Sequence, residues 1–116
     1  MKVLIVDDEP LVRRALLRAF RVSGHEVCEA SSGEEAKEVW PSFKPDVVFL
    51  DVIMPGLTGP QVLEDVDDPD AKVILMSAYA GDHEVQAGEG ARAVHFLAKP
   101  FTDVFAVVKM AESLRS

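Results

Sequence analysis

The chain has 116 residues, a length typical of a single domain with one hydrophobic core, and 48% of them are apolar. Its 20 acidic and 12 basic residues give a net charge of −8, which argues against direct binding to nucleic acid or to an anionic membrane. Cys28 is the single cysteine, so no internal disulfide can form, and no apolar run is long enough for a signal peptide or a membrane span. We therefore expect one soluble domain in the cytoplasm, compatible with a metal cation or a basic partner.

The first thirty residues predict a strand, a helix and a second strand. The β-branched run at 3–6 is typical of a strand buried on both faces. From Pro10 onward the apolar residues fall at helical spacing, with arginines largely on the opposite side, and Gly24 is a suitable stop for this helix. Residues 26–30 then predict a weaker strand.

A second helix is predicted next. Ser32 and Glu35 have the spacing of a capping box, which marks the start of a helix. Pro41 and Pro45 are expected to bound the end of this helix. The apolar run at 46–50 that follows is the clearest strand of the chain.

The second half of the chain continues the alternation. The pattern predicts a short helix, a strand, a helix interrupted by glycines and a further strand, at 59–66, 71–78, 81–91 and 93–98. A last helix follows, and either Thr102 or Asp103 can cap it.

Alternating strands and helices, with nearly continuous apolar strands, predict an α/β fold in which helices cover both faces of a parallel sheet. A closed eight-unit barrel needs about 250 residues, so this length excludes it. The expected architecture is a doubly wound open sheet of five parallel strands, a (βα)5 fold of the flavodoxin-like type, forming one domain over residues 1–116. Ligands of such sheets bind beyond the carboxyl ends of the strands.

Carboxylates, a hydroxyl and an ammonium group follow every predicted strand except the second. These residues are Asp7, Asp8, Glu9, Asp51, Ser77 and Lys99. Clustered carboxylates raise one another's pKa, and a divalent cation relieves the repulsion. Mg²⁺ suits such a site because it accepts one or two carboxylates and leaves positions for phosphate oxygens. One carboxylate could then attack phosphorus, while the hydroxyl and the ammonium meet the phosphoryl oxygens.

Each of these residues also has an ordinary structural explanation. Asp7 and Asp8 can cap the following helix, and Asp51 can begin a turn. Ser77 can be a simple strand-end hydroxyl, and Lys99 a solvated surface lysine. The interpretation as a phosphate-directed site rests on the combination of all of them at one edge of the sheet.

Four motifs resemble the receiver domains of two-component response regulators, the CheY-like superfamily. They are LIVDDEP at 4–10, DVVFLDVIMPGLTG at 46–59, VILMSAYA at 73–80 and FLAKPF at 96–101. The resemblance covers the whole chain, and the motifs stand in the family's order and at nearly its spacing. It implies Mg²⁺-dependent transfer of a phosphoryl group to Asp51 from a sensor histidine kinase or a phosphotransfer domain. The protein would then be a switch, and not an enzyme that acts on other substrates.

The resemblance also implies the metal ligands, residue by residue. Asp7 or Asp8, or both, would hold Mg²⁺, directly or through water, and Asp8 would be a direct ligand. Asp51 would be a second direct ligand, and the backbone carbonyl of Ile53 a further one.

The same resemblance implies how the switch operates. Lys99 would pair with the phosphoryl group, and Ser77 would supply the hydroxyl that moves toward it. Phe96 stands at the position of the aromatic residue that turns inward with this movement. The Lys99–Pro100 peptide bond would be cis, as cis bonds are essentially a proline feature. The switched surface, formed by the fourth helix, fifth strand and fifth helix, would bind a downstream effector protein or domain.

Two large side chains stand two residues past the nucleophile and the hydroxyl. These residues, Ile53 and Tyr79, are expected to shield the phosphoryl group from water and prolong its lifetime. The alternative is that they only pack the edge of the site.

Partner surfaces are less strongly indicated. The arginine-rich face of the first helix is a candidate docking surface for the kinase or phosphotransfer domain, although a solvated helix face explains it as well. The stretch 59–77 looks about one helical turn shorter than is common in the family, so a short third helix is expected. Phosphorylation-dependent homodimerisation stays open, as does the choice between a single-domain regulator and a part of a larger protein.

Three rival functions fit the sequence less well. A hydrolase of the haloacid dehalogenase type carries an acid two residues past its nucleophile, where this chain has Ile53. A flavodoxin-like nucleotide binder would carry a glycine-rich loop after the first strand, and VDDEPLV contains no glycine. A degenerate receiver, acting as a phosphorylation-independent binding module, usually lacks the acidic pair, the aspartate or the lysine, all of which are present.

Overall fold

The computed structural model describes residues 1–78 and 94–115 of the chain. Five parallel strands form one sheet in the order β2-β1-β3-β4-β5. The strands are β1 (Lys2–Val6), β2 (Glu26–Ala30), β3 (Val47–Asp51), β4 (Lys72–Ser77) and β5 (Val94–Ala98). This order, with β1 and β3 at the centre, is that of a doubly wound sheet, so the predicted fold class is confirmed.

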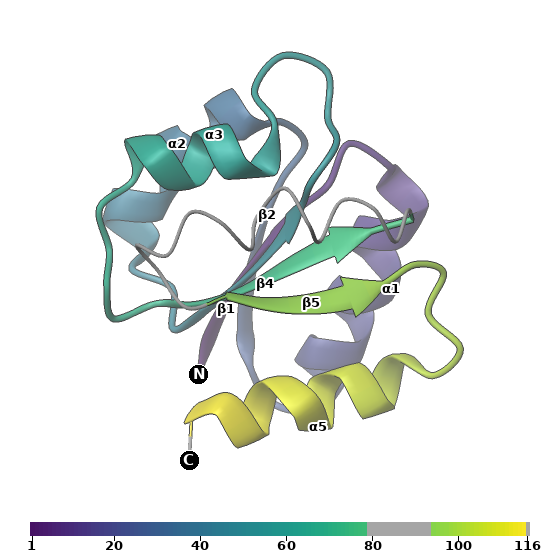
Figure 1. Cartoon of the computed structure of the whole chain (residues 1–116). Helices are drawn as coiled ribbons and strands as arrows, with labels where there is room; N and C mark the ends of the chain where they lie inside the picture. Colours follow the sequence, from purple (N-terminus) through teal and green to yellow (C-terminus); the bar gives the residue numbers. More distant parts are fainter. Residues whose placement is uncertain (79–93, 116) are drawn as a thin grey trace.

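Helices cover both faces of the sheet (Figure 1). On one face lie α1 (Pro10–Val22) and α5 (Val104–Arg115), and on the other lie α2 (Gly33–Phe43) and α3 (Gly59–Asp65). The helix predicted at 81–91 lies outside the described residues. No described helix is long and apolar enough to cross a membrane.

The strand side chains alternate between two hydrophobic cores. In β1, Val3 and Ile5 pack under α1 and α5, whereas Leu4 and Val6 pack under α2 and α3. All four are fully buried, and the five residues of β3 are buried as well. Burial on both faces explains why these strands are continuous apolar runs and not alternating ones.

The structure moves the end of the third strand and places the end of the second helix between the two predicted prolines. Residues 46–50 were predicted as the third strand, but β3 ends one residue later, because Asp51 is still paired in register with Met76. Pro41 and Pro45 are expected to bound the end of the second helix, and α2 ends between them at Phe43, with Pro41 inside its last turn. The fully buried ring of Trp40 and its indole N–H, which donates to Asp68, hold the last turn in place.

The helix starts show which of the predicted capping residues make a cap. Ser32 accepts from the backbone of Glu35, as predicted, but the Glu35 carboxylate accepts from Ser31 and so does not complete the box. Asp103, and not Thr102, caps α5 by accepting from two backbone N–H groups of its first turn. The third helix has seven residues, which confirms that it is short.

Gly59 lets α3 begin directly against the carboxyl end of β3. A Cβ atom at this position would lie 2.6 Å from the backbone carbonyl oxygen of Asp51. The Gly59 N–H donates to the Val52 carbonyl over 3.0 Å, so this contact closes the loop between β3 and α3. The loop borders the side chain of Asp51, and its course therefore depends on a residue without a side chain.

Gly59→Ala is expected to lower the free energy of unfolding by about 1–3 kcal/mol, because the new methyl group meets rigid backbone and not a movable side chain. Urea denaturation followed by circular dichroism measures the change. Glu64→Ala, an exposed substitution on the same helix, serves as the control and is expected to stay within about 0.5 kcal/mol of wild type. Equal stability of the two variants would contradict this account of Gly59.

Candidate functional site

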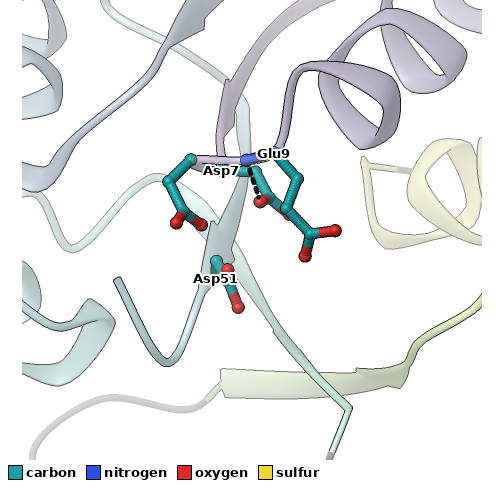
Figure 2. Close-up of side chains that lie close together, drawn as sticks. Asp7, Glu9 and Asp51 are labelled. Atoms are coloured by element: carbon teal, nitrogen blue, oxygen red, sulfur yellow. Dashed lines mark hydrogen bonds between the residues drawn. The ribbon is translucent and has the colours of Figure 1, made fainter. Parts of the chain in front are cut away.

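Four carboxylates meet at the carboxyl ends of β1 and β3. Asp7 follows β1 and is fully buried, while Asp51 ends β3 and is 4% exposed. Asp8 and Glu9 are exposed at the rim. One oxygen atom from each of these four residues lies within 4.8 Å of the others. Figure 2 shows Asp7, Glu9 and Asp51 gathered at this edge of the sheet.

Asp7 is fixed by contacts on every side. Its Oδ1 accepts from the backbone N–H of Glu9 over 2.9 Å, and its Oδ2 accepts from Lys99 Nζ over 3.0 Å. The Asp7 carbonyl accepts from the guanidinium of Arg13 over 2.7 Å, and Arg13 is itself paired with Glu29. These contacts tie the buried carboxylate to α1, β2 and the loop after β5.

Lys99 brings a cation into this cluster from the end of β5. Its Nζ lies 3.0 Å from Asp7, 3.1 Å from Glu9 and 3.4 Å from Asp51. Its backbone N–H donates to the Ser77 carbonyl over 2.9 Å, and the bond to Pro100 is cis, as the family resemblance implies. Desolvation alone would lower the pKa of Lys99, but the hydrogen bond to Asp7 and the surrounding negative charge outweigh it and raise this pKa.

Asp51 has the most strongly perturbed carboxyl group of the described site. Burial, the negative charge of Asp7 and, to a smaller extent, that of Asp8 raise the pKa of Asp51 from 3.8 to about 7, although Lys99 opposes the shift. Mutual repulsion of the acids was predicted, and burial adds the largest contribution. Without a further cation, Asp51 therefore holds its proton to a higher pH than an ordinary aspartate does.

The residues predicted from strands three, four and five share one pocket. Its volume is about 300 Å³, and it is lined by Asp8, Glu9, Asp51, Ile53, Ser77, Ala78 and Lys99. Ser77 ends β4 and is 4% exposed, whereas Ile53 is 54% exposed at the mouth of the pocket. The pocket thus places a buried carboxyl group, a hydroxyl and an ammonium around one space.

One predicted residue lies away from the pocket, and a second falls outside the described residues. Phe96 stands on β5, opposite Leu75 in register, and packs against the core under α2 and α3, away from the pocket lining. Tyr79 lies outside the described residues.

Sequence reasoning missed the contacts of Glu9 and Arg13. Both stand at the start of α1, where an acid after a strand and an arginine on an amphipathic helix have ordinary explanations. The sequence places Asp7, Asp8 and Glu9 side by side and does not indicate which of these carboxylates contacts Lys99. Glu9 lies 90 residues from Lys99 in sequence, so this contact follows from the sheet order and not from any local pattern.

The cluster suits a hard divalent cation. If all four carboxylates are ionised, Lys99 leaves a net charge of −3 at the site, and every candidate ligand atom is an oxygen. Oxygen ligands from one or two carboxylates are those that Mg²⁺ takes in proteins while it keeps several waters. The exposure of Asp8 leaves room for such waters on one side.

The chain is similar to known proteins over most of its length. The sequence profile of the family described as response regulator receiver domain matches residues 3–110. The positive alginate biosynthesis regulatory protein of Pseudomonas aeruginosa is 43% identical over 103 residues, which are 86% of this chain and 42% of that protein. Chemotaxis protein CheY of Thermotoga maritima is 38% identical over 103 residues, which are 86% of each of the two chains.

A solved structure shows the same fold. The response regulator protein TrrA of Thermotoga maritima, in complex with Mg²⁺ and BeF, superimposes with a TM-score of 0.83 at 31% identity. The match covers 97% of each chain. The likeness therefore extends over the sheet and its helices, whereas the chain spans less than half of the alginate regulator.

Titration of Asp51 is expected to make the metal-free protein less stable as the pH rises. The folded protein keeps this proton up to about pH 7, whereas an unfolded chain releases it near pH 4. The protonated form therefore contributes stability that is present below about pH 4 and is lost between about pH 4 and 7. Asparagine does not titrate, so Asp51→Asn does not lose this stability. The free energy of unfolding of Asp51→Asn minus that of wild type is expected to be roughly 1–4 kcal/mol larger at pH 8 than at pH 4.

Urea titrations in the presence of EDTA, followed by the fluorescence of the buried Trp40, measure this difference. Asp70→Asn removes an exposed acid outside the cluster and is the control. A stability difference between Asp51→Asn and wild type that stays constant with pH would show that the carboxyl group titrates normally.

Proposed function

Because the chain belongs to the response regulator receiver domain family of two-component systems, we propose that it is a phosphoacceptor switch with Asp51 as its nucleophile. The observation that carries the proposal is the pocket in which the buried carboxyl group of Asp51 faces the ammonium of Lys99 at 3.4 Å, beside Ser77. The proposed donor is a sensor histidine kinase or a phosphotransfer domain. Self-phosphorylation and self-dephosphorylation are then the chain's own reactions, without a further substrate.

In the proposed step, a carboxylate oxygen of Asp51 attacks the phosphorus of a phosphohistidine. The bond between phosphorus and the imidazole nitrogen breaks, and the nitrogen keeps the electron pair. The product is an acyl phosphate on Asp51, a mixed anhydride of a carboxylic and a phosphoric acid. Lys99 lies near enough to donate to a phosphoryl oxygen, and burial of Asp51 favours attack because it limits the water around the carboxylate.

We propose Mg²⁺ as the cofactor, held by Asp7, Asp8, Asp51 and the backbone carbonyl of Ile53. When bound, Mg²⁺ neutralises the charge that accumulates between the carboxylates and the phosphoryl oxygens. Asp7 is already oriented by the Glu9 N–H, and Asp51 by its place in the β3–β4 ladder. The chain thus supplies an oxygen-rich site whose two buried ligands need little rearrangement.

The proposed output is a change in the surface formed by α4, β5 and α5, of which α4 falls outside the described residues. Ser77 ends β4 beside the pocket, and Phe96 is partly buried in the adjacent β5. Movement of the Ser77 hydroxyl toward a phosphoryl group would favour the inward position of Phe96, so phosphorylation shifts an equilibrium between two surfaces. A downstream effector, or a second copy of the chain, would bind the favoured one.

We further propose that the phosphodonor docks along α1. Arg14, Arg18 and Arg21 are exposed on this helix, together with Leu11 at 81% and Val22 at 71%. The helix starts directly after the acidic residues, so a partner lying on it can reach Asp51. An exposed basic and apolar face is suited to a complementary helical partner.

Incubation with acetyl phosphate and Mg²⁺ is expected to add one phosphoryl group to the wild-type protein, because Asp51 is the nucleophile of the pocket. Intact mass spectrometry measures the adduct, which should be absent without Mg²⁺ and in Asp51→Asn. Asp70→Asn, which keeps the whole pocket, is expected to behave as wild type. A folded wild-type protein that binds Mg²⁺ and forms no adduct would favour the binding-module alternative.

Ile53→Asn is expected to increase the rate of self-dephosphorylation by about three- to tenfold, which corresponds to about 0.7–1.4 kcal/mol in the barrier. The side chain stands at the mouth of the pocket, where a polar group can orient an attacking water that isoleucine excludes. Loss of the phosphoryl group is followed after removal of the donor. The control is Leu11→Asn, which changes an exposed apolar residue outside the pocket lining. An unchanged rate of decay in Ile53→Asn would show that Ile53 only packs the edge of the site.

A further inference from the structure

Glu9 occupies an unusual place at the start of α1. It is the residue that precedes the first helical turn, a position where side chains commonly accept a hydrogen bond from their own helix. The Glu9 carboxylate makes no such cap in the described structure. Its Oε1 instead accepts from Lys99 Nζ over 3.1 Å, across the mouth of the pocket. Figure 2 shows the Glu9 side chain extending from the end of β1 on the same side as Asp51.

The ammonium of Lys99 has three N–H donors, and three carboxylates surround it. The two hydrogen bonds to Asp7 and Glu9, at 3.0 and 3.1 Å, are shorter than the 3.4 Å approach to Asp51. Lys99 is therefore held slightly away from the group that accepts the phosphoryl group. A phosphoryl group on Asp51 that draws the ammonium closer therefore competes with the hydrogen bonds to Asp7 and Glu9.

Glu9 is the partner that can be released at the lowest cost. Asp7 is fully buried, and its other oxygen is already bonded to the backbone, so loss of Lys99 would leave a buried charge without compensation. The side chain of Glu9 is 61% exposed, so its carboxylate can turn to water when Lys99 leaves. The geometry thus distinguishes a fixed partner of Lys99 from an exchangeable one.

We propose that Glu9 is a positioning residue that holds the ammonium of Lys99 against Asp7 until a phosphoryl group arrives at Asp51. Breaking the contact between Glu9 and Lys99 is then part of the free-energy cost of seating the phosphoryl group. This inference rests on the proposed function, because it assumes that Lys99 serves a phosphoryl group on Asp51. It predicts that Glu9 lowers the affinity of the site for that group.

Two substitutions separate the contact from the charge. Glu9→Gln removes the charge and weakens the contact with Lys99. Glu9→Asp keeps the charge, but its side chain is one methylene shorter and is well suited to cap α1 instead. Both variants are expected to bind a phosphoryl mimic about two- to fivefold more tightly than wild type, the range expected for the loss of a partly exposed ion pair. Glu38→Gln, an exposed acid on α2, is the matched control and should leave the affinity unchanged.

Beryllofluoride binds a carboxylate as a mimic of a phosphoryl group. The measurement is a calorimetric titration of the full chain with beryllofluoride at saturating Mg²⁺. A second readout is the ¹⁵N resonance of the Lys99 ammonium in the protein without the mimic. It should shift in both Glu9 variants, and a role of Glu9 in helix capping alone would not move it.

Tighter binding in Glu9→Gln and in Glu9→Asp, with a shifted Lys99 resonance, would support the inference. Tighter binding in Glu9→Gln alone would overturn it, because negative charge at the mouth would then be sufficient. Unchanged affinity in both variants would overturn it as well, while binding by wild type keeps the proposed function. If wild type does not bind beryllofluoride and Asp51 takes no phosphoryl group, the proposed function and this inference fall together.

Discussion

The structure depends on the pairing of two desolvated carboxylates, Asp7 and Asp51, with the ammonium of Lys99. The two acids stand at the ends of adjacent central strands and are nearly or fully buried, an arrangement that is unfavourable without a cation. Lys99 comes from β5, at the edge of the sheet, and can reach both because the carboxyl ends of parallel strands meet at one side. The raised pKa of Asp51 shows that this single ammonium compensates the buried charge only in part.

The remaining elements serve to hold this cluster in position. Arg13 on α1 binds the Asp7 carbonyl, Gly59 lets α3 start against the Asp51 carbonyl, and the Lys99 N–H bonds to the Ser77 carbonyl. Each contact joins a different helix or strand to the same few atoms. Asp51 is therefore joined to β4 by the strand ladder and to the end of β5 by Lys99, without a flexible connection.

The fold and the residues of the site could be predicted because each depends on local sequence. Buried strands are apolar runs, and the polar residue that ends each run falls at a shared edge, so the sequence indicated Asp51 and Lys99 without their geometry. Contacts decided by tertiary packing escaped prediction. Trp40 holds the last turn of α2, which contains a proline. Glu9, which follows β1, bonds to Lys99, which follows β5, three places away in the sheet.

On the proposed function, one lysine has two tasks. In the resting site Lys99 neutralises buried acids, and in the phosphorylated site it neutralises the phosphoryl group. The net stabilisation of the phosphorylated site is therefore the free energy of the new contact minus that of the contacts that Lys99 gives up. A cation already engaged with carboxylates makes the two states close in free energy, and small free-energy differences are what allow a modification to shift a population. A lysine without such partners would bind the phosphoryl group more tightly, and loss of the phosphoryl group from the site would then be more difficult. The acidic environment of Lys99 thus favours a reversible switch over a permanent phosphate-binding site.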